Sequence, residues 1–163
     1  MKIAVCPGSF DPVTYGHLDI ITRACDLFDR IYVAVLDNPA KQALFTAEER
    51  VELLRKATEH LDIVVCEQFG GLVVEYAKRR GAVAIVRGLR AVTDFEYELK
   101  MASMNHHLDK DVETVFMMTS NEWSFLSSSA VKEVASLGGD ISAWVPPCVA
   151  EALTKRFVQA HRD

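Results

Sequence analysis

The sequence predicts an α/β fold: a Rossmann-like, doubly wound parallel sheet of five strands with helices on both faces. Five short apolar runs rich in β-branched residues recur along the chain, and polar residues or glycine bound each of them. Stretches with helical spacing lie between these runs, so strands and helices alternate. Because each connection between parallel strands must carry the chain back across the sheet, this alternation favours a parallel sheet.

The individual elements follow from local patterns. The strand-like runs are Ile3–Cys6, Ile31–Leu36, Ile63–Cys66, Val83–Val86 and Val112–Met118. Apolar residues with helical spacing mark the first three helices, in the groups Leu18, Ile21, Cys25 and Phe28, then Val51, Leu54 and Ala57, then Val73, Tyr76 and Ala77. Capping boxes at Thr46–Glu49 and Thr93–Glu96 predict two helix starts. A last helix is expected after Pro146-Pro147.

The expected helix from Thr93 to about Leu108 is apolar on two faces. One face carries Phe95, Leu99 and Ala102, and the other carries Tyr97, Met101, Met104 and Leu108. One face can serve the core, whereas the second needs another cover. We expect an interface between copies of the chain, and the alternative is burial by the C-terminal helix.

Composition limits the class of protein. The 163 residues are 50% hydrophobic, which suits a single domain over residues 1–163. The net charge of −5 argues against nucleic-acid binding. The four cysteines form no C-x-x-C pair, so we expect reduced thiols in a cytoplasmic protein. The apolar runs are too short for a membrane span, and no signal-peptide pattern is seen.

The first strand-to-helix turn, PGSFDPVTYGH at residues 7–17, has the features of a phosphate site. Free amides and partial positive charge gather at a helix start, although neither G-x-G-x-x-G nor the P-loop pattern is present. Gly8 permits close approach of the backbone, and Ser9 adds a hydroxyl. His17 enters the first helical turn, where an imidazole donor suits charge on a phosphoryl group. The alternative is a histidine that caps or packs the helix.

Two later blocks add to an anion site. Arg87-Gly88-Leu89-Arg90 follows a strand and places two guanidiniums at the ligand end of the sheet. Ser127-Ser128-Ser129 precedes a helical stretch and offers hydroxyls and free amides to a second anion; the alternative is a plain serine N-cap, which needs only one of the three. Glu98 is expected to contact an adenosine group or to anchor an arginine. Lys132 either adds charge there or faces solvent.

Other residues are given structural roles. His106 and His107 are adjacent on a helix and point about 100° apart, so they do not chelate one ion and are expected at a surface or interface. Phe45, Phe69 and Trp144 are expected to pack in the core rather than to stack on a nucleotide.

These motifs resemble a known family. Thr14–His17 has the T-x-G-H form of the nucleotidyltransferase superfamily. Together with PGSFDP, with RGLR followed by DFEYE at 94–98, and with WSFLSSS at 123–129, it makes the chain similar along nearly its whole length to the bacterial phosphopantetheine adenylyltransferases. The resemblance implies transfer of the adenylyl group of ATP to 4′-phosphopantetheine, giving dephospho-coenzyme A and pyrophosphate without a covalent enzyme intermediate.

The resemblance also implies roles for residues. His17 would stabilise the transition state. The acceptor would be held by Ser9, Lys41, Val73 and Arg87. ATP would be held by Ser9, Phe10, His17, Gly88, Leu89, Arg90, Glu98, Trp123, Ser124, Phe125, Leu126, Ser127, Ser128 and Ser129. Mg²⁺ would be bound through phosphates and water, with no protein ligands, and the chain would form a homohexamer. Whether coenzyme A inhibits is left open.

Two positions depart from the family pattern. The family carries threonine at position 9 and a second lysine at position 42, where this chain has Ser9 and Gln42. Two alternatives for function remain. One is another small-molecule nucleotidyltransferase, acting on nicotinate mononucleotide or a polyol phosphate. The other is a non-catalytic module that binds a nucleotide and releases no pyrophosphate.

Overall fold

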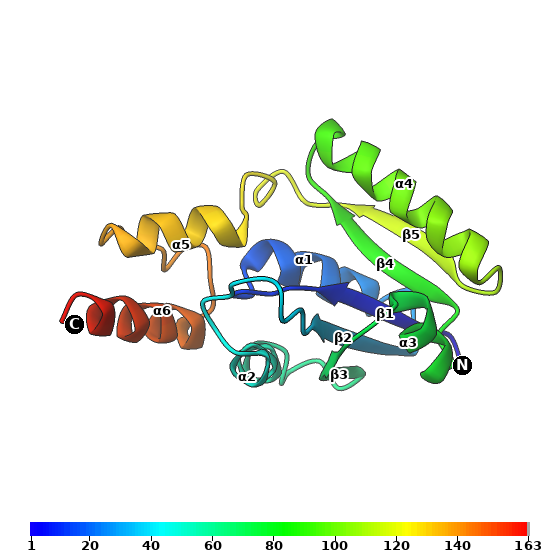
Figure 1. Cartoon of the computed structure of the whole chain (residues 1–163), viewed down its shortest axis with the longest axis horizontal. Helices are drawn as coiled ribbons and strands as arrows, with labels where there is room; N and C mark the ends of the chain where they lie inside the picture. The colour runs from blue at the N-terminus through cyan, green and yellow to red at the C-terminus, as the bar shows by residue number, and fades with distance from the viewer. Residues whose placement is uncertain (163) are drawn as a thin grey trace.

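A parallel sheet of five strands forms the centre of the protein. The computed structural model describes residues 1–162, without the side chain of Thr93. The strands are β1 (Ile3–Gly8), β2 (Arg30–Leu36), β3 (Val64–Phe69), β4 (Ala84–Leu89) and β5 (Glu113–Met118). All neighbouring pairs are parallel, in the order β3-β2-β1-β4-β5 (Figure 1). The predicted fold class is confirmed.

Helices cover both faces of this sheet. They are α1 (Tyr15–Ala24), α2 (Ala47–Ala57), α3 (Val73–Arg79), α4 (Val92–Leu108), α5 (Ser128–Ser136) and α6 (Pro147–Ala160). Alternate residues of β1 face different cores: Ala4 and Cys6 pack with α1, α2, α5 and α6, whereas Val5 packs with α3. This alternation, with a period of two, explains why the strands read as continuous apolar runs rather than as alternating ones.

The predicted helix starts were right at one position and wrong at another. Thr46 caps α2 through a capping box with Glu49, as expected. Helix α4 instead begins at Val92 with Ala91 as its N-cap, so the predicted start at Thr93 is wrong. The side chain of Thr93 lies outside the described residues. Because Ala91 has no side-chain acceptor, no side chain caps this end of α4.

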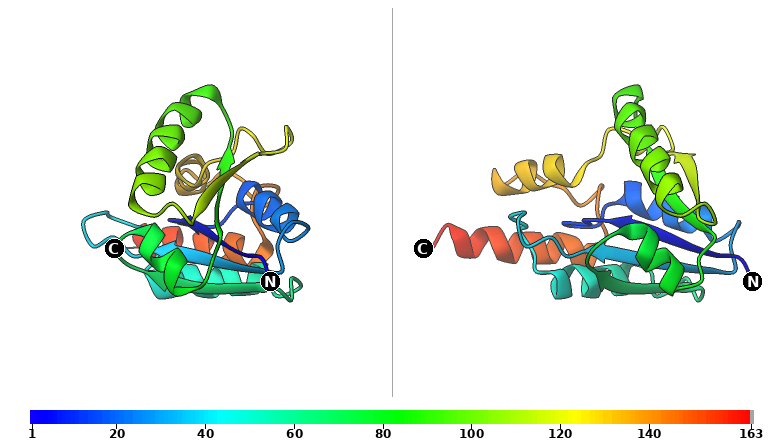
Figure 2. Two further views of the ribbon diagram at one scale, coloured as in Figure 1. Left: turned by 90° about the vertical axis from the view of Figure 1, so that its right-hand side faces the viewer. Right: turned by 45° about the vertical axis from the view of Figure 1, so that its right-hand side comes forward.

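The two apolar faces of α4 are only partly covered. Helix α4 packs on β4, β5 and α3, while α6 packs on α2 and α5 toward the opposite end of the molecule (Figures 1 and 2). The alternative that the C-terminal helix covers α4 is therefore wrong. The exposed fractions of Tyr97, Met104 and Leu108 are 62%, 53% and 59%, so this face is left open in the single chain.

The order of the strands fixes where a ligand binds. The chain runs outward from β1 through β2 to β3, and then crosses to β4 and β5 on the other side of β1. In such sheets the connections on the two sides of the reversal leave the sheet in opposite directions, which opens a crevice at the carboxyl ends of the two central strands. Here those ends are Gly8 of β1 and Leu89 of β4.

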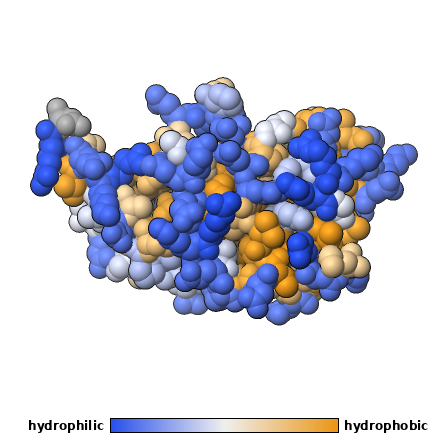
Figure 3. All heavy atoms as spheres, turned by 90° about the horizontal axis from the view of Figure 1, so that it is seen from below, coloured by the Kyte–Doolittle hydropathy of each residue, from blue (hydrophilic) through white to orange (hydrophobic). Residues whose placement is uncertain are grey.

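The face in Figure 3 is mostly hydrophilic, and its largest apolar patch lies in the half of the molecule away from the C-terminus. Within residues 1–162, no helix combines the length and the apolar character that a membrane crossing requires.

Candidate functional site

The turn after β1 is tight and filled by an aromatic ring. Phe10 adopts a positive φ of 47°, which is rare for a residue with a side chain, and its ring is buried. A Cβ at Gly8 would lie 3.0 Å from this ring, so the position accepts only glycine without a shift of the ring. The Phe10 ring meets the His17 ring edge to face, with the centroids 5.0 Å apart. The turn therefore holds the histidine from one side.

His17 is both a cap of α1 and a wall of a cavity. The backbone N–H of Thr14 donates to Nδ1 of His17 at 3.0 Å, and the backbone N–H of His17 faces the Thr14 hydroxyl at 3.5 Å. Since a backbone amide can only donate, Nδ1 is the acceptor and the proton of the neutral ring sits on Nε2. The capping role is thus confirmed, and the same residue lines the cavity, while its action on a phosphoryl group stays a prediction.

The electrostatic surroundings keep this imidazole neutral. Burial, followed by the positive charges of Arg90 and Arg87, lowers the pKa of His17 to about 4. At neutral pH the ring therefore carries no charge. It offers a single N–H donor and is not a general acid.

The first cavity, here the His17 cavity, has a volume of about 490 Å³. It opens at the carboxyl ends of β1 and β4 and reaches the start of α5. Its polar wall combines His17 with the guanidiniums of Arg87 and Arg90 and the hydroxyls of Ser127 and Ser128. Two carboxylates, Asp94 and Glu98, also line the cavity and are paired with Arg90 and Arg87, so this wall offers hydrogen-bond donors to an anion rather than unpaired charge.

The second cavity, here the Lys41 cavity, has a volume of about 450 Å³ and a different character. Apart from Lys41 and Arg87, its wall is largely apolar. The apolar lining residues are Leu36, Phe69, Leu72, Val73, Ile85, Met101 and Ala102. The two cavities share one wall, made of Pro7, Gly8, Ser9, Arg87, Tyr97 and Glu98. The two cavities therefore adjoin along these six residues.

Arg87 in the shared wall is held by three hydrogen bonds. Its Nε and Nη2 donate to the two carboxylate oxygens of Glu98 at 2.9 and 2.6 Å, and its Nη1 donates to the Pro7 carbonyl at 2.8 Å. Glu98 thus anchors an arginine, which was one of its two expected roles. The bidentate geometry fixes the plane of the guanidinium at the end of β4.

Arg90 connects the end of β4 to the segment before α5. Its Nη1 donates to the Leu126 carbonyl at 2.7 Å, and its Nε donates to Asp94 at 3.3 Å. This contact brings two segments that are far apart in the sequence to the same rim of the His17 cavity.

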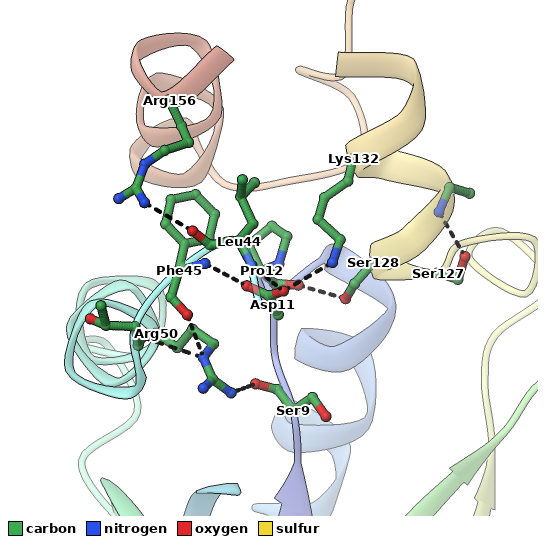
Figure 4. Close-up of polar contacts among 12 residues, drawn as sticks. Ser9, Asp11, Pro12, Leu44, Phe45, Arg50, Ser127, Ser128, Lys132 and Arg156 are labelled. Carbon is green, nitrogen blue, oxygen red and sulfur yellow. Dashed lines mark hydrogen bonds and ion pairs between the residues drawn. The ribbon is translucent and has the colours of Figure 1, made fainter. Parts of the chain in front are cut away.

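A polar network lies beside the turn after β1, which the sequence predicts to be a phosphate site (Figure 4). Asp11 accepts hydrogen bonds from the backbone N–H groups of Leu44 and Phe45 and from the ammonium of Lys132, at 2.9 to 3.0 Å. Burial alone would raise the pKa of Asp11, but these hydrogen bonds and the Lys132 charge outweigh it and hold the pKa below its usual value. Lys132 therefore joins α5 to the turn and does not simply face solvent. Ser128 adds a second link, because its hydroxyl donates to the Pro12 carbonyl at 2.7 Å.

A third and smaller cavity lies beside this network. This Arg50 cavity has a volume of about 100 Å³ and contacts both larger cavities through Ser9. It is lined by Ser9, Asp11, Leu36, Asn38, Lys41, Gln42, Ala43, Arg50, Ser128, Ser129 and Lys132.

Most of the residues predicted from the sequence come together. The His17 cavity is lined by Ser9, Phe10, His17, Arg87, Gly88, Arg90, Glu98, Leu126, Ser127 and Ser128. The Lys41 cavity is lined by Ser9, Lys41, Val73, Arg87 and Glu98, and Ser129 lines the Arg50 cavity.

Four predicted ATP contacts do not line these cavities: Leu89, Trp123, Ser124 and Phe125. The Trp123 ring packs on Tyr15, and the Phe125 ring packs on Trp144. Their contact with a nucleotide stays a prediction. His106 and His107 are exposed in the last turn of α4. Among residues 1–162, no three His, Cys, Asp or Glu side chains are grouped as a metal site would require.

Sequence reasoning missed several lining residues. Met101 and Asn105 lie one helical turn apart on α4 and both face the Lys41 cavity, although Met101 was assigned only to an apolar face. Thr119, directly after β5, lines the His17 cavity. Its position at a strand end was the signal that could have found it. Phe69 is buried against Tyr76, as expected for a packing residue, but it also lines the Lys41 cavity.

Comparisons with known proteins agree with this geometry. The crystal structure of a protein from Vibrio parahaemolyticus, described as a nicotinate-nucleotide adenylyltransferase, superposes with a TM-score of 0.70 at 18% identity, covering 95% of this chain and 93% of the other. The nicotinic acid mononucleotide adenylyltransferase of Plasmodium falciparum, complexed with NaAD, superposes with a TM-score of 0.71 at 13% identity, covering 94% and 95%. At these identities the likeness establishes the fold. The sequence profile of the cytidylyltransferase-like family matches residues 5–134, which include the turn after β1, Arg87, Arg90 and the start of α5. The chain therefore belongs to the cytidylyltransferase-like family of the nucleotidyltransferase superfamily.

Proposed function

We propose that this protein transfers the adenylyl group of ATP to 4′-phosphopantetheine and releases dephospho-coenzyme A and pyrophosphate. The observation that carries this proposal is the shared wall of the two large cavities. A cavity rich in cations and donors, suited to a triphosphate, adjoins a largely apolar cavity with cations at the wall. Two phosphorylated ligands would meet at Gly8 and Ser9.

The reaction needs no protein nucleophile. An oxygen of the acceptor phosphate attacks the α-phosphorus of ATP, and the bond from that phosphorus to the bridging oxygen of the β-phosphate breaks as pyrophosphate leaves. The neutral His17 donates its Nε2–H to the negative charge on the reacting phosphoryl group. Arg87 and Arg90 add positive charge on the same side.

The lining of the Lys41 cavity supports an acceptor with a phosphate at one end and a long, weakly polar arm. Lys41 and Arg87 supply the charge for the phosphate, and the aliphatic wall suits the arm. Asn105 and Thr114 supply side-chain hydrogen-bonding groups for the amides of a pantetheine chain. Val73 lies in this wall, as the family resemblance implies.

The second candidate for the acceptor is nicotinate mononucleotide, which the names of the two structural neighbours favour. Such an acceptor carries a carboxylate on its ring in addition to the phosphate. Burying that carboxylate requires a cation or several donors in the cavity. Within the described lining, the only cations are Lys41 and Arg87, which the phosphate already requires, so the ring carboxylate would depend on neutral donors such as Asn105 and Thr114 in an otherwise largely apolar wall. We therefore rank this acceptor second.

Mg²⁺ fits the site as an ion held by phosphates and water. The carboxylates that line the His17 cavity, Asp94 and Glu98, are each paired with an arginine. The proposal therefore places Mg²⁺ on the phosphates and on water, without a protein ligand. The bound ion would neutralise charge on the phosphates, and every positioning contact described above comes from the protein itself.

We also propose that the open face of α4 is buried between copies of the chain, as in the hexamers that the family resemblance implies. The exposed Tyr97, Met104 and Leu108 support this assembly. Light scattering of the purified protein would test it.

A coupled pyrophosphate assay tests the function directly. The protein is incubated with ATP and Mg²⁺, and with 4′-phosphopantetheine, nicotinate mononucleotide or a polyol phosphate in parallel; the polyol phosphate is also tested with CTP. We expect pyrophosphate only with 4′-phosphopantetheine. If pyrophosphate is released with nicotinate mononucleotide and with no other acceptor, the second acceptor is the correct one. Binding of ATP with no pyrophosphate from any acceptor would identify a non-catalytic module.

The assignment of Lys41 has its own test. Lys41→Ala should raise the KM for 4′-phosphopantetheine about tenfold or more, because a charged contact to phosphate is lost. The KM for ATP should change less. Lys110→Ala, in the exposed turn between α4 and β5, is the matched control. Unchanged acceptor kinetics in Lys41→Ala would overturn the role of this lysine.

A further inference from the structure

Near the end of the loop between β2 and α2, two residues, Leu44 and Phe45, are held by charged side chains. Their backbone N–H groups donate to the carboxylate of Asp11 at 2.9 and 3.0 Å. The Leu44 carbonyl accepts from Arg156 at 2.9 Å. The Phe45 carbonyl accepts from Arg50 at 3.1 Å. All four backbone polar groups of this pair, here the 44–45 anchor, therefore bond to side chains of the turn after β1, of α6 and of α2 (Figure 4).

Arg50 joins the anchor to the start of the same loop. Its Nη1 also donates to the carbonyl of Leu36, the last residue of β2, at 3.2 Å and to that of Ser9 at 2.8 Å. Only 5% of Arg50 is exposed, and among residues 1–162 no carboxylate pairs with it. Because a buried charge is costly unless it is hydrogen-bonded, breaking one of these contacts costs more than breaking a contact between neutral groups. One guanidinium therefore fixes both ends of the loop at 37–43, here the Lys41 loop, against the turn after β1.

Lys41 itself carries a charge that no carboxylate holds. Its ammonium forms no ion pair within residues 1–162, and its side chain lines both the Lys41 cavity and the Arg50 cavity. Its backbone N–H donates to the Asn38 carbonyl at 3.1 Å. Because a lysine ammonium sits on a flexible stem, the backbone of the loop decides which part of the cavities it can reach. The position of this charge therefore depends on how firmly the two ends of the loop are held.

We propose that Asp11, Arg50 and Arg156 are positioning residues for the acceptor, because they hold the 44–45 anchor and so fix the Lys41 loop before the ligand binds. A loop that is ordered in advance does not have to be ordered on binding, which improves affinity. The inference rests on the proposed function for one point, that Lys41 binds the phosphate of the acceptor. Arg156 lines none of the three cavities described above, so any effect of this residue on a ligand is indirect.

Arg156→Gln therefore gives the clearest test. 4′-Phosphopantetheine, and ATP with Mg²⁺, are titrated separately by calorimetry into the full-length wild type, Arg156→Gln and the control Lys155→Gln. Lys155 is the neighbour on α6, and it pairs with Glu151 at the surface. In Arg156→Gln the Kd for phosphopantetheine should rise about threefold or more, because a charged hydrogen bond to the anchor is lost. The Kd for ATP, and both Kd values of Lys155→Gln, should stay within about twofold.

A double-mutant cycle separates positioning from a general weakening of the site. In the Lys41→Ala background, Arg156→Gln should change the Kd for phosphopantetheine by less than about twofold, because the lysine that it positions is absent. If the rise is as large in that background as in the wild type, Arg156 acts through another route and the inference fails. Equal weakening of ATP and phosphopantetheine would also overturn it, since that pattern means that Arg156 only supports the fold.

Proteolysis tests the loop without any ligand. A lysine-specific endoproteinase keeps its sites when an arginine is replaced, and mass spectrometry follows the bond between Lys41 and Gln42. The rate of this cleavage should rise about threefold or more in Arg156→Gln, because the loop opens more often, and it should rise further in Arg50→Gln. Cleavage after Lys110, in the exposed turn between α4 and β5, is the internal control. An equal rise at both sites would mean a loosened fold, and no rise after Lys41 would refute the anchor. If Arg50→Gln does not unfold cooperatively, Arg156→Gln decides alone.

The two proposals fail separately. If no acceptor yields pyrophosphate but Arg156→Gln loses phosphopantetheine binding selectively, the proposed function fails and the positioning role stands. If 4′-phosphopantetheine is adenylylated and Arg156→Gln binds it as tightly as wild type does, the function stands and the positioning role fails.

Discussion

The neutral state of His17 predicts a pH dependence of stability that one substitution should remove. Burial and the charges of Arg90 and Arg87 lower the pKa of His17 to about 4, against an ordinary value of 6.5. Between these two pH values the unfolded chain binds a proton at this histidine and the folded chain does not. The free energy of unfolding must therefore decrease as pH falls from 6.5 to 4.

The size of the effect follows from the same two values. One pKa unit corresponds to about 1.4 kcal/mol, so the difference between 6.5 and about 4 gives roughly 3 kcal/mol for this group alone. That is a large part of the stability of a domain of this size, which typically unfolds with 5 to about 15 kcal/mol.

The substitution His17→Gln isolates the contribution of His17 to the pH dependence of the free energy of unfolding. Position 17 is the third residue of α1, and its side chain accepts the Thr14 amide within a capping box. Glutamine is a usual residue at that position of a capping box, so the cap should persist while the titrating ring is lost. Urea unfolding is followed by circular dichroism from pH 4 to 7 for both proteins.

The difference between the two curves is the measured quantity. Asp11, Asp19 and Glu49 also have lowered pKa values, because hydrogen bonds and neighbouring cations outweigh their burial. Their contributions are lost in both proteins as pH falls, and they cancel in the difference. Wild type should lose up to about 3 kcal/mol more than His17→Gln between pH 6.5 and 4. Parallel curves would refute the neutral imidazole whose Nδ1 accepts the Thr14 amide.

In His17→Gln kcat should also fall roughly 100-fold or more, with ATP affinity little changed.

Two further substitutions test the framework of the site. Glu98→Gln removes the negative charge of the partly buried, bidentate pair with Arg87, so the free energy of unfolding in urea should fall by about 1–3 kcal/mol. Glu96→Gln is the control: Glu96 is exposed on the same helix, and its free energy of unfolding should stay within about 0.5 kcal/mol of wild type. Equal losses in the two variants would contradict the pairing. Gly139→Ala places a Cβ 2.4 Å from Cγ1 of Val134, a stiff β-branched side chain, so thermal unfolding should show a loss of about 1–3 kcal/mol. At Gly70 an added Cβ meets no atom within 4 Å, so a loss in Gly70→Ala as large as that in Gly139→Ala would show that packing is not the cause.

The sequence was sufficient for the fold because the signals are local. Apolar runs and helical spacings placed all five strands and the helices to within a few residues. Strands β1, β3 and β4 extend beyond the predicted runs at their carboxyl ends; in β1 the run is interrupted by Pro7-Gly8, and in β4 it is interrupted by Arg87-Gly88. These residues still pair with the neighbouring strands, although Gly8 and Arg87 line the cavities and not the core. A prediction based on apolar residues therefore ends these strands before the structure does.

The candidate site was predicted in part, for a similar reason. Charged groups that follow strands, such as Arg87 and Arg90, are visible because parallel strands bring their ends to one edge. Arg50 was not visible, because its partners are backbone carbonyls from the segments at Ser9, Leu36 and Phe45–Thr46, and carbonyls have no sequence signature. The sequence reasoning treated capping and a place in the site as alternatives for His17, whereas this residue both caps α1 and lines the cavity. Capping boxes are recognised by Glu or Gln at that position, and imidazole is not among the usual residues.

The bidentate pair of Arg87 and Glu98 borders both large cavities, and this has a consequence for how the ligands influence each other. Under the proposed function, one guanidinium contributes to the potential in both cavities, so its charge cannot be assigned in full to both phosphates. Whichever ligand binds first alters the field that the other encounters. By thermodynamic reciprocity each ligand must then change the affinity of its neighbour by the same factor, and dissociation constants measured singly will not describe the ternary complex.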